Sequence, residues 1–140
     1  MDAPNQPDQP IKTPPEWVLL VDDDQHLREI VTEQLLSLRV QVLAADRGET
    51  AREIVLLKSS APFLAIIDVM MPGMDGFTLA RRLISRFKRK TRIVIISGHL
   101  TAASWWPADL REATFLPKPF RFSDIERIVA EARAARSQPE

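Results

Sequence analysis

Short apolar runs alternate with helix-like periodicity along most of this chain, and this alternation is what most constrains its fold. Runs of strand length are predicted as strands at 17–21, 40–44, 63–67, 93–96 and 113–116. Apolar residues spaced three or four apart predict helices within 27–38, 48–59, 77–87 and 125–132. Strands that are apolar on both faces are typical of a parallel sheet covered by helices on both sides. With right-handed crossovers, the pattern predicts an open, doubly wound α/β fold.

The domain organisation follows from length and from the distribution of proline. The chain has 140 residues, which is enough for one ordinary domain. Five of its 11 prolines fall within residues 1–15, where Ile11 is the only large apolar side chain after Met1. We therefore predict a flexible Pro-rich tail over 1–15, a domain over 16–135 and a short tail over 136–140. The first tail is interpreted as an inert leader, with partner binding as the alternative.

Charge and composition exclude several classes of function. Lys plus Arg and Asp plus Glu both total 19, so no net positive charge is present to hold nucleic acid. The absence of cysteine excludes disulfides, thiolate metal sites and a thiol nucleophile. No apolar run approaches the roughly 20 residues of a membrane span, and no signal peptide is apparent, so we expect a cytoplasmic protein. A basic run over 81–92 is interpreted as a solvated helix face and turn.

Charged and hydroxyl side chains stand where the predicted strands end. Asp22 and Asp23 follow the first strand, Asp68 the third, Ser97 the fourth and Lys118 the fifth. In a doubly wound fold, ligands bind beyond the carboxyl ends of the strands, so these side chains should converge. Crowded carboxylates repel one another unless a cation is present, and oxygen ligands without histidine or cysteine favour Mg²⁺ over zinc.

Each of these residues also has a plainer interpretation. Asp24 is well placed to cap the first helix, with Asp22 and Asp23 near the positive end of its dipole. Asp68 could be a loop residue or a cap, Ser97 could belong to an ordinary turn with Gly98, and a lone lysine is usually solvated. Their convergence at one edge favours chemistry instead, because a carboxylate can act as a nucleophile and form an acyl phosphate.

Four motifs then resemble the receiver domain of bacterial two-component response regulators, of the stand-alone, chemotaxis-regulator-like kind. They read LLVDDD at 19–24, IIDVMMPGMDG at 66–76, IISG at 95–98 and FLPKPF at 115–120. The resemblance extends over about 16–135. It implies a flavodoxin-like five-stranded parallel sheet with strand order 2-1-3-4-5. It also implies a Mg²⁺-dependent switch that signals through protein contacts.

The resemblance implies a role for each matching position. Asp68 would be the phosphoacceptor. Mg²⁺ would be bound by Asp22, Asp23 and Asp68 and by the backbone carbonyl of Met70, with Asp22 acting mainly through water. Lys118 would contact the phosphoryl group, and its bond to Pro119 is expected to be cis. The switch residues would be Ser97 and Phe115, and the positions that tune the lifetime of the phosphoryl group would be Met70 and His99.

The segment after the fourth strand departs from the family. Pro107 breaks a helix interior, so we predict a fourth helix that is short, displaced or irregular. Trp105 and Trp106 are interpreted as one core anchor plus one half-exposed ring, or as an aromatic surface for a partner. Phe115 lacks a hydroxyl, so a switch there can act only through packing.

The predicted function is that of a single-domain response regulator. Asp68 would accept a phosphoryl group from a sensor histidine kinase or a histidine phosphotransfer protein. Nothing after residue 135 is expected to form an output domain, and no DNA-binding domain or membrane partner is expected. The protein would catalyse its own phosphorylation and dephosphorylation without being a metabolic enzyme. The alternatives are a Mg²⁺-dependent phosphatase acting through an aspartyl-phosphate and a degenerate receiver that acts as an assembly module. The kinase, the downstream target and the oligomeric state stay open.

Overall fold

Five parallel strands form one sheet in the order β2-β1-β3-β4-β5, as the resemblance implied. The computed structural model describes residues 16–58, 60–98 and 107–136. In chain order the elements are β1 (Trp17–Val21), α1 (Gln25–Ser37), β2 (Gln41–Ala45), α2 (Gly48–Leu57), β3 (Leu64–Asp68), α3 (Gly76–Phe87), the 3-10 turn η1 (Lys88–Lys90), β4 (Arg92–Ser97), the 3-10 turn η3 (Ala108–Leu110), β5 (Thr114–Pro117) and α4 (Phe122–Arg136).

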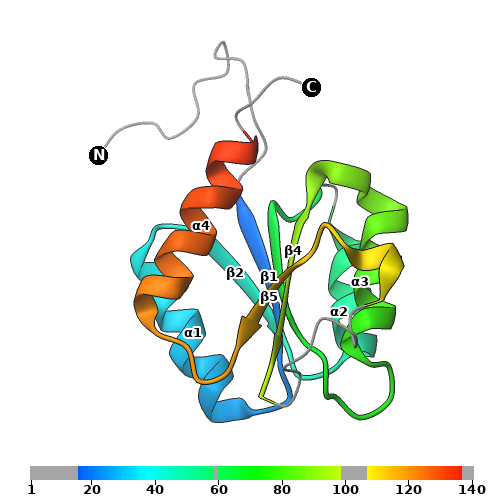
Figure 1. The fold of residues 1–140 in the computed structure, drawn as a ribbon, viewed down its shortest axis with the longest axis horizontal. Coiled ribbons are helices and arrows are strands. Elements are labelled where there is room, and N and C mark those ends of the chain that lie inside the picture. The colour runs from blue at the N-terminus through cyan, green and yellow to red at the C-terminus, as the bar shows by residue number, and fades with distance from the viewer. Residues whose placement is uncertain (1–15, 59, 99–106, 137–140) are drawn as a thin grey trace.

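Helices cover both faces of the sheet, which confirms the predicted doubly wound fold. The helices α1 and α4 lie on one face and α2 and α3 on the other (Figure 1). Strand side chains alternate between the two faces and form two separate cores. Leu19 and Ile67 pack on the α2–α3 side, whereas Leu20 and Ile66 pack on the α1–α4 side. Strand β1 is therefore buried along its whole length, which explains its unbroken apolar sequence.

The strand register aligns the carboxyl ends of the central strands. Val21 pairs with Ile67, Asp68 pairs with Ile96, and Ser97 pairs with Pro117. All the strand bounds lie within one residue of those predicted. Apolar patterning locates a strand but does not determine the residue at which its pairing ends. The residues that follow these strands consequently share one edge of the sheet.

The connection between β4 and β5 lacks a regular α-helix in its described part. After Pro107 the chain makes only the three-residue turn η3, where Leu110 is buried against the α2–α3 side. This agrees with the prediction of a short or irregular fourth helix, so the label α4 belongs to the last helix. His99, Trp105 and Trp106 lie outside the described residues, as do 1–15 and 137–140, so the predictions for them and for the tails stay untested.

Packing at the amino-terminal edge ties the two ends of the domain together. Arg133 of α4 donates to Oε1 of Glu16 at 3.1 Å and to the carbonyl oxygen of Leu38 at 3.1 Å. Arg136 adds an ion pair with Glu16 at 3.3 Å.

Among the helices in the described ranges, none is both long and apolar enough to cross a membrane.

Candidate functional site

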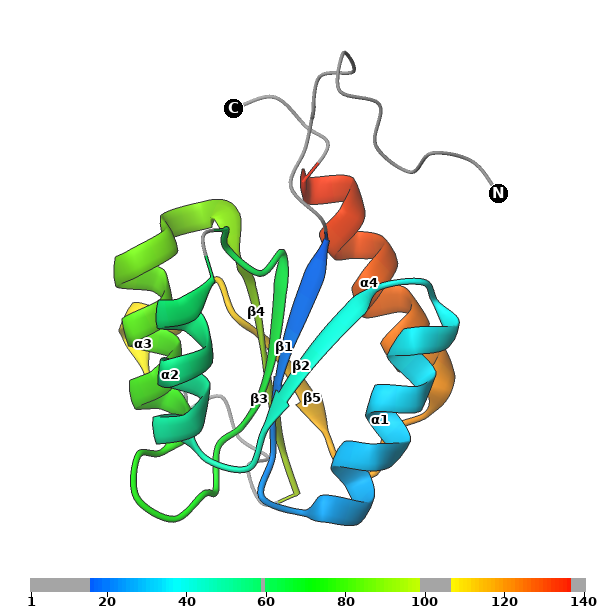
Figure 2. The ribbon, with the colours of Figure 1, turned by 180° about the vertical axis from the view of Figure 1, so that it is seen from behind.

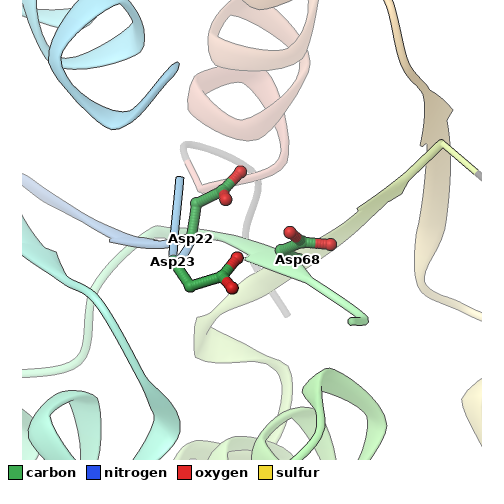
Figure 3. A group of neighbouring side chains, drawn as sticks. All are labelled: Asp22, Asp23 and Asp68. Carbon is green, nitrogen blue, oxygen red and sulfur yellow. The ribbon is translucent and has the colours of Figure 1, made fainter. Parts of the chain in front are cut away.

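Three carboxylates meet at the carboxyl edge of the sheet. Asp22 and Asp23 follow β1, and Asp68 ends β3, as Figure 3 shows. Each offers an oxygen atom, and these oxygens lie within 4.8 Å of one another. Asp22 and Asp68 are buried, whereas Asp23 is exposed. The convergence predicted from the sequence is therefore present.

Local hydrogen bonds fix the first of these acids. Oδ1 of Asp22 accepts from the backbone N–H of Asp24 at 2.9 Å, which turns the chain out of β1. Asp24 in turn caps α1, because its Oδ1 accepts from the N–H of Leu27 at 3.2 Å. The capping interpretation is thus right for Asp24. Arg28 also donates to the backbone carbonyl of Asp22 at 2.7 Å, a contact that no motif in the sequence indicated.

Asp68 is held from both sides. Its Oδ1 accepts from the backbone N–H of Met70 at 3.1 Å, and its Oδ2 lies 3.1 Å from Nζ of Lys118. The same ammonium lies 3.3 Å from Oδ2 of Asp22. Lys118 is positioned by β5, since its backbone N–H donates to the carbonyl of Ser97 at 3.0 Å. The peptide bond between Lys118 and Pro119 is cis, as expected.

One ammonium shared by two buried carboxylates cannot neutralise both. Burial, together with the charge of Asp22, raises the pKa of Asp68 to about 6, although Lys118 and the N–H of Met70 act in the opposite direction. Burial alone would lower the pKa of Lys118, but the charges of Asp22 and Asp68 outweigh it and raise that pKa. The site therefore carries excess negative charge at neutral pH.

The donor set fits a hard divalent cation. Oδ2 of Asp22 is buried and receives no well-directed hydrogen bond from the described residues, although Lys118 is nearby. Three carboxylates against one ammonium leave a local charge that Mg²⁺ would balance, and all the side-chain ligands would be oxygen atoms. This acidic pocket fits Mg²⁺ binding. Coordination of Mg²⁺ by the backbone carbonyl of Met70 stays a prediction.

Glycine at position 76 lets α3 begin directly against the end of β3, where Asp68 lies. A Cβ added there would collide with the backbone carbonyl of Asp68 and lie 2.8 Å from Cα of Val69. The N–H of Gly76 donates to the carbonyl of Val69 at 3.1 Å. Sequence reasoning included Gly76 only as part of a motif and missed this close approach. It also missed Asp75 as the helix cap, which accepts from Thr78 at 2.9 Å and which its position before the helix could have indicated.

The two predicted switch residues lie in neighbouring strands. Ser97 is buried at the end of β4 and pairs in register with Pro117. Phe115 of β5 is half-buried, pairs with Ile95 and packs against the core on the α2–α3 side. Their roles stay predictions.

The sequence of this chain is similar to those of known receiver proteins. A family described as the response regulator receiver domain matches residues 18–130. The response regulator receiver protein CpdR of Brucella abortus is 33% identical over 110 residues, which cover 77% of this chain and 88% of CpdR. The transcriptional regulatory protein GltR of Pseudomonas aeruginosa is 38% identical over 87 residues, 62% of this chain.

A solved structure agrees with the sequence comparisons. The CheY-like receiver domain protein from Methanospirillum hungatei superimposes with a TM-score of 0.73 at 25% identity, covering 88% of this chain and 98% of that one. Several relatives are longer: the chain spans 34% of GltR, 50% of the response regulator MprA of Mycolicibacterium vanbaalenii and 27% of a probable transcriptional regulator of Porphyra purpurea. Because that family matches residues 18–130 and CpdR is 33% identical over most of both chains, this chain belongs to the response regulator receiver domain family.

Proposed function

We propose that Asp68 accepts a phosphoryl group from a sensor histidine kinase or a histidine phosphotransfer protein, and that the chain signals through protein contacts. The observation that carries this proposal is the setting of Asp68: a buried carboxylate with one oxygen fixed by Met70 N–H and the other beside Lys118. A carboxylate held in this way is a positioned nucleophile. Family membership supports the donor, because receivers take part in phosphotransfer from histidine.

The proposed reaction requires little beyond positioning and charge neutralisation. An oxygen of Asp68 attacks phosphorus, its bond to phosphorus forms, and the bond from phosphorus to the donor nitrogen breaks. The released nitrogen takes a proton and leaves as neutral imidazole. Lys118 moves its charge from the carboxylate toward the phosphoryl oxygens, and the hydroxyl of Ser97 donates to one of them. Mg²⁺, held by Asp22, Asp23, Asp68 and the Met70 carbonyl, would supply further neutralisation of the phosphoryl charge.

The proposed switch starts from Ser97. Its hydroxyl moves toward the phosphoryl group, and Phe115 rotates into the space that is left. Because Phe115 has no hydroxyl and is only half-buried, the change acts through packing against the neighbouring core. The two states then differ in side-chain contacts, which is what a partner needs to distinguish them.

The proposed mode of action is that of a stand-alone regulator in the cytoplasm. It is supported by CpdR, 88% of whose length this chain covers. Within the described residues no DNA-binding module accompanies the sheet and its helices. The proposed output is a contact between the receiver and a target protein.

The phosphatase alternative lacks a residue that its chemistry usually requires. Such enzymes need a second acid two positions after the nucleophile, to protonate the leaving group, and that position is Met70, whose side chain is 56% exposed. The degenerate-receiver alternative is disfavoured by the intact set of Asp68, Lys118 and Ser97.

Intact-mass measurement after incubation with acetyl phosphate and Mg²⁺ tests the proposal. The protein should gain one phosphoryl group, and hydroxylamine should remove it, as expected for an acyl phosphate but not for a serine ester. Asp68→Asn should show no adduct, while Asp109→Asn, the same substitution at an exposed acid, should behave as wild type. An adduct that persists in Asp68→Asn, or none in wild type, would contradict the proposal. Turnover of general phosphate esters would favour the phosphatase.

A further inference from the structure

A small groove with an apolar floor runs between α2 and α3. Its floor is formed by Val55 and Leu56 of α2 and by Leu79 and Leu83 of α3. Its volume is about 120 Å³, well below the roughly 300–1,000 Å³ of small-molecule sites. Leu56 is 54% exposed, so part of this apolar floor is open to solvent. The groove has room for one apolar side chain rather than for a cofactor.

Three arginines line the same groove. Arg52 lies on α2, and Arg82 and Arg86 lie one turn apart on α3. All three are exposed, and none forms an ion pair within the described part of the chain. Their neighbour Arg81 differs, because it pairs with Asp109 at 2.7 Å. The α3 sequence contains no acidic residue, so Arg82 and Arg86 have no carboxylate within their own helix.

The basic run over 81–92 is therefore more than a uniformly solvated face. Arg81 is tied to the turn η3, whereas Arg82 and Arg86 are placed beside apolar surface. Guanidinium groups pair with carboxylates through two parallel hydrogen bonds, and they keep their charge beside apolar surface more readily than ammonium groups do. A floor that accepts an apolar side chain, rimmed by guanidiniums, is complementary to a segment that carries both apolar and acidic groups.

We propose that the α2–α3 groove docks an acidic amphipathic helix of a partner protein, with one apolar side chain in the groove and carboxylates against Arg52, Arg82 and Arg86. Helices commonly bind this way, through apolar anchors three or four residues apart. Nucleic acid is the poorer fit, because three cations on a chain of zero net charge neutralise few phosphates, and the apolar floor has no role in phosphate binding.

This surface is distinct from the phosphoacceptor site. The helices α2 and α3 cover the sheet face opposite α1 and α4 (Figures 1 and 2). The groove is lined by residues of these two helices alone, whereas Asp68 lies at the carboxyl end of β3. Docking in the groove does not depend on phosphorylation of Asp68. It can therefore be measured on the unphosphorylated full chain in EDTA, where failure of the proposed phosphotransfer would not affect the result.

The probe is a fluorescein-labelled peptide of about 15 residues, long enough for an isolated helix, with leucine on one face and glutamate on the others. Fluorescence anisotropy should show saturable binding that weakens with salt. The double variant Arg82→Glu/Arg86→Glu should weaken binding at least about tenfold. The matched control, Arg111→Glu/Arg121→Glu, makes the same charge change at two exposed arginines elsewhere and should bind as wild type. Leu56→Ser should also weaken binding, without any change of charge.

Several results would overturn the proposal. One is absence of peptide binding, and another is equal loss of affinity in the two double variants. A peptide with serine in place of leucine that binds equally well would show a purely ionic contact. Tighter binding of a single-stranded oligonucleotide, lost in Arg82→Glu/Arg86→Glu, would assign the surface to nucleic acid. Self-association by sedimentation, abolished by that variant, would assign it to a second copy of the chain.

Discussion

Replacing Asp68 with asparagine should make the metal-free protein more stable at neutral pH. The carboxylate has a pKa of about 6 in the folded state, against 3.8 for an ordinary aspartate. Each unit of pKa shift corresponds to about 1.4 kcal/mol. Keeping Asp68 ionised in the folded state above pH 6 therefore lowers the free energy of unfolding by about 3 kcal/mol. Asparagine removes that charge and keeps an oxygen for the N–H of Met70, but it loses the ion pair with Lys118. We expect a net gain of about 1 to 3 kcal/mol in the free energy of unfolding.

The effect should depend on pH in a defined direction. Between pH 4 and pH 6 folded Asp68 retains a proton that the unfolded chain releases, so wild-type stability falls as the pH rises through this window. The advantage of Asp68→Asn should therefore be largest above pH 6 and shrink to less than about 1 kcal/mol near pH 4. Adding Mg²⁺ should shrink the advantage of Asp68→Asn by up to about 2.7 kcal/mol, which is the gain of wild type at a Mg²⁺ concentration 100 times its dissociation constant.

Urea unfolding in EDTA at several pH values, with and without Mg²⁺, measures these differences. Asp23→Asn is the matched control, because it removes the same charge from an exposed position in the same cluster and should change metal-free stability far less. A metal-free Asp68→Asn protein that is no more stable than wild type at pH 7.5 would refute the reasoning. So would a difference that does not vary with pH.

The remaining predictions concern residues around the site. Gly76→Ala should lower stability by more than about 2 kcal/mol and slow phosphorylation by acetyl phosphate, because its Cβ meets backbone. Gly48→Ala meets the Met74 side chain, from its Cβ outward, rather than backbone and should cost less, and equal losses would refute this. Lys118→Met should destabilise the metal-free protein by about 2 to 4 kcal/mol on urea unfolding, since two buried carboxylates lose their cation; unchanged stability would contradict this. Asp24→Ala should cost about 1 kcal/mol through loss of the α1 cap, and Asp24→Asn much less. Asp23→Asn should weaken Mg²⁺ binding by isothermal titration, and unchanged affinity would remove it from the ligand set.

The sequence by itself determined the architecture and the positions that matter at the carboxyl edge. Apolar strands such as 17–21 and 63–67 identified a two-sided parallel sheet, because only burial on both faces allows an unbroken apolar run. In such a sheet, residues that follow parallel strands share one edge, so the sequence alone predicted that Asp22 and Asp68 lie close together. Asp24 could be recognised as a cap from its position before the helix.

Only the tertiary structure decided which charges face one another and how far each is buried. That Lys118 is shared between Asp22 and Asp68, and that Asp23 stays exposed, depends on side-chain directions and solvent access that no motif encodes. The difference between Arg81, which is paired, and Arg82, which lines the groove, likewise requires the packing of α2 and η3 against α3. Local sequence fixes secondary structure through short-range periodicity, whereas the electrostatics of a site arise from contacts between segments up to 96 positions apart, from Asp22 to Lys118.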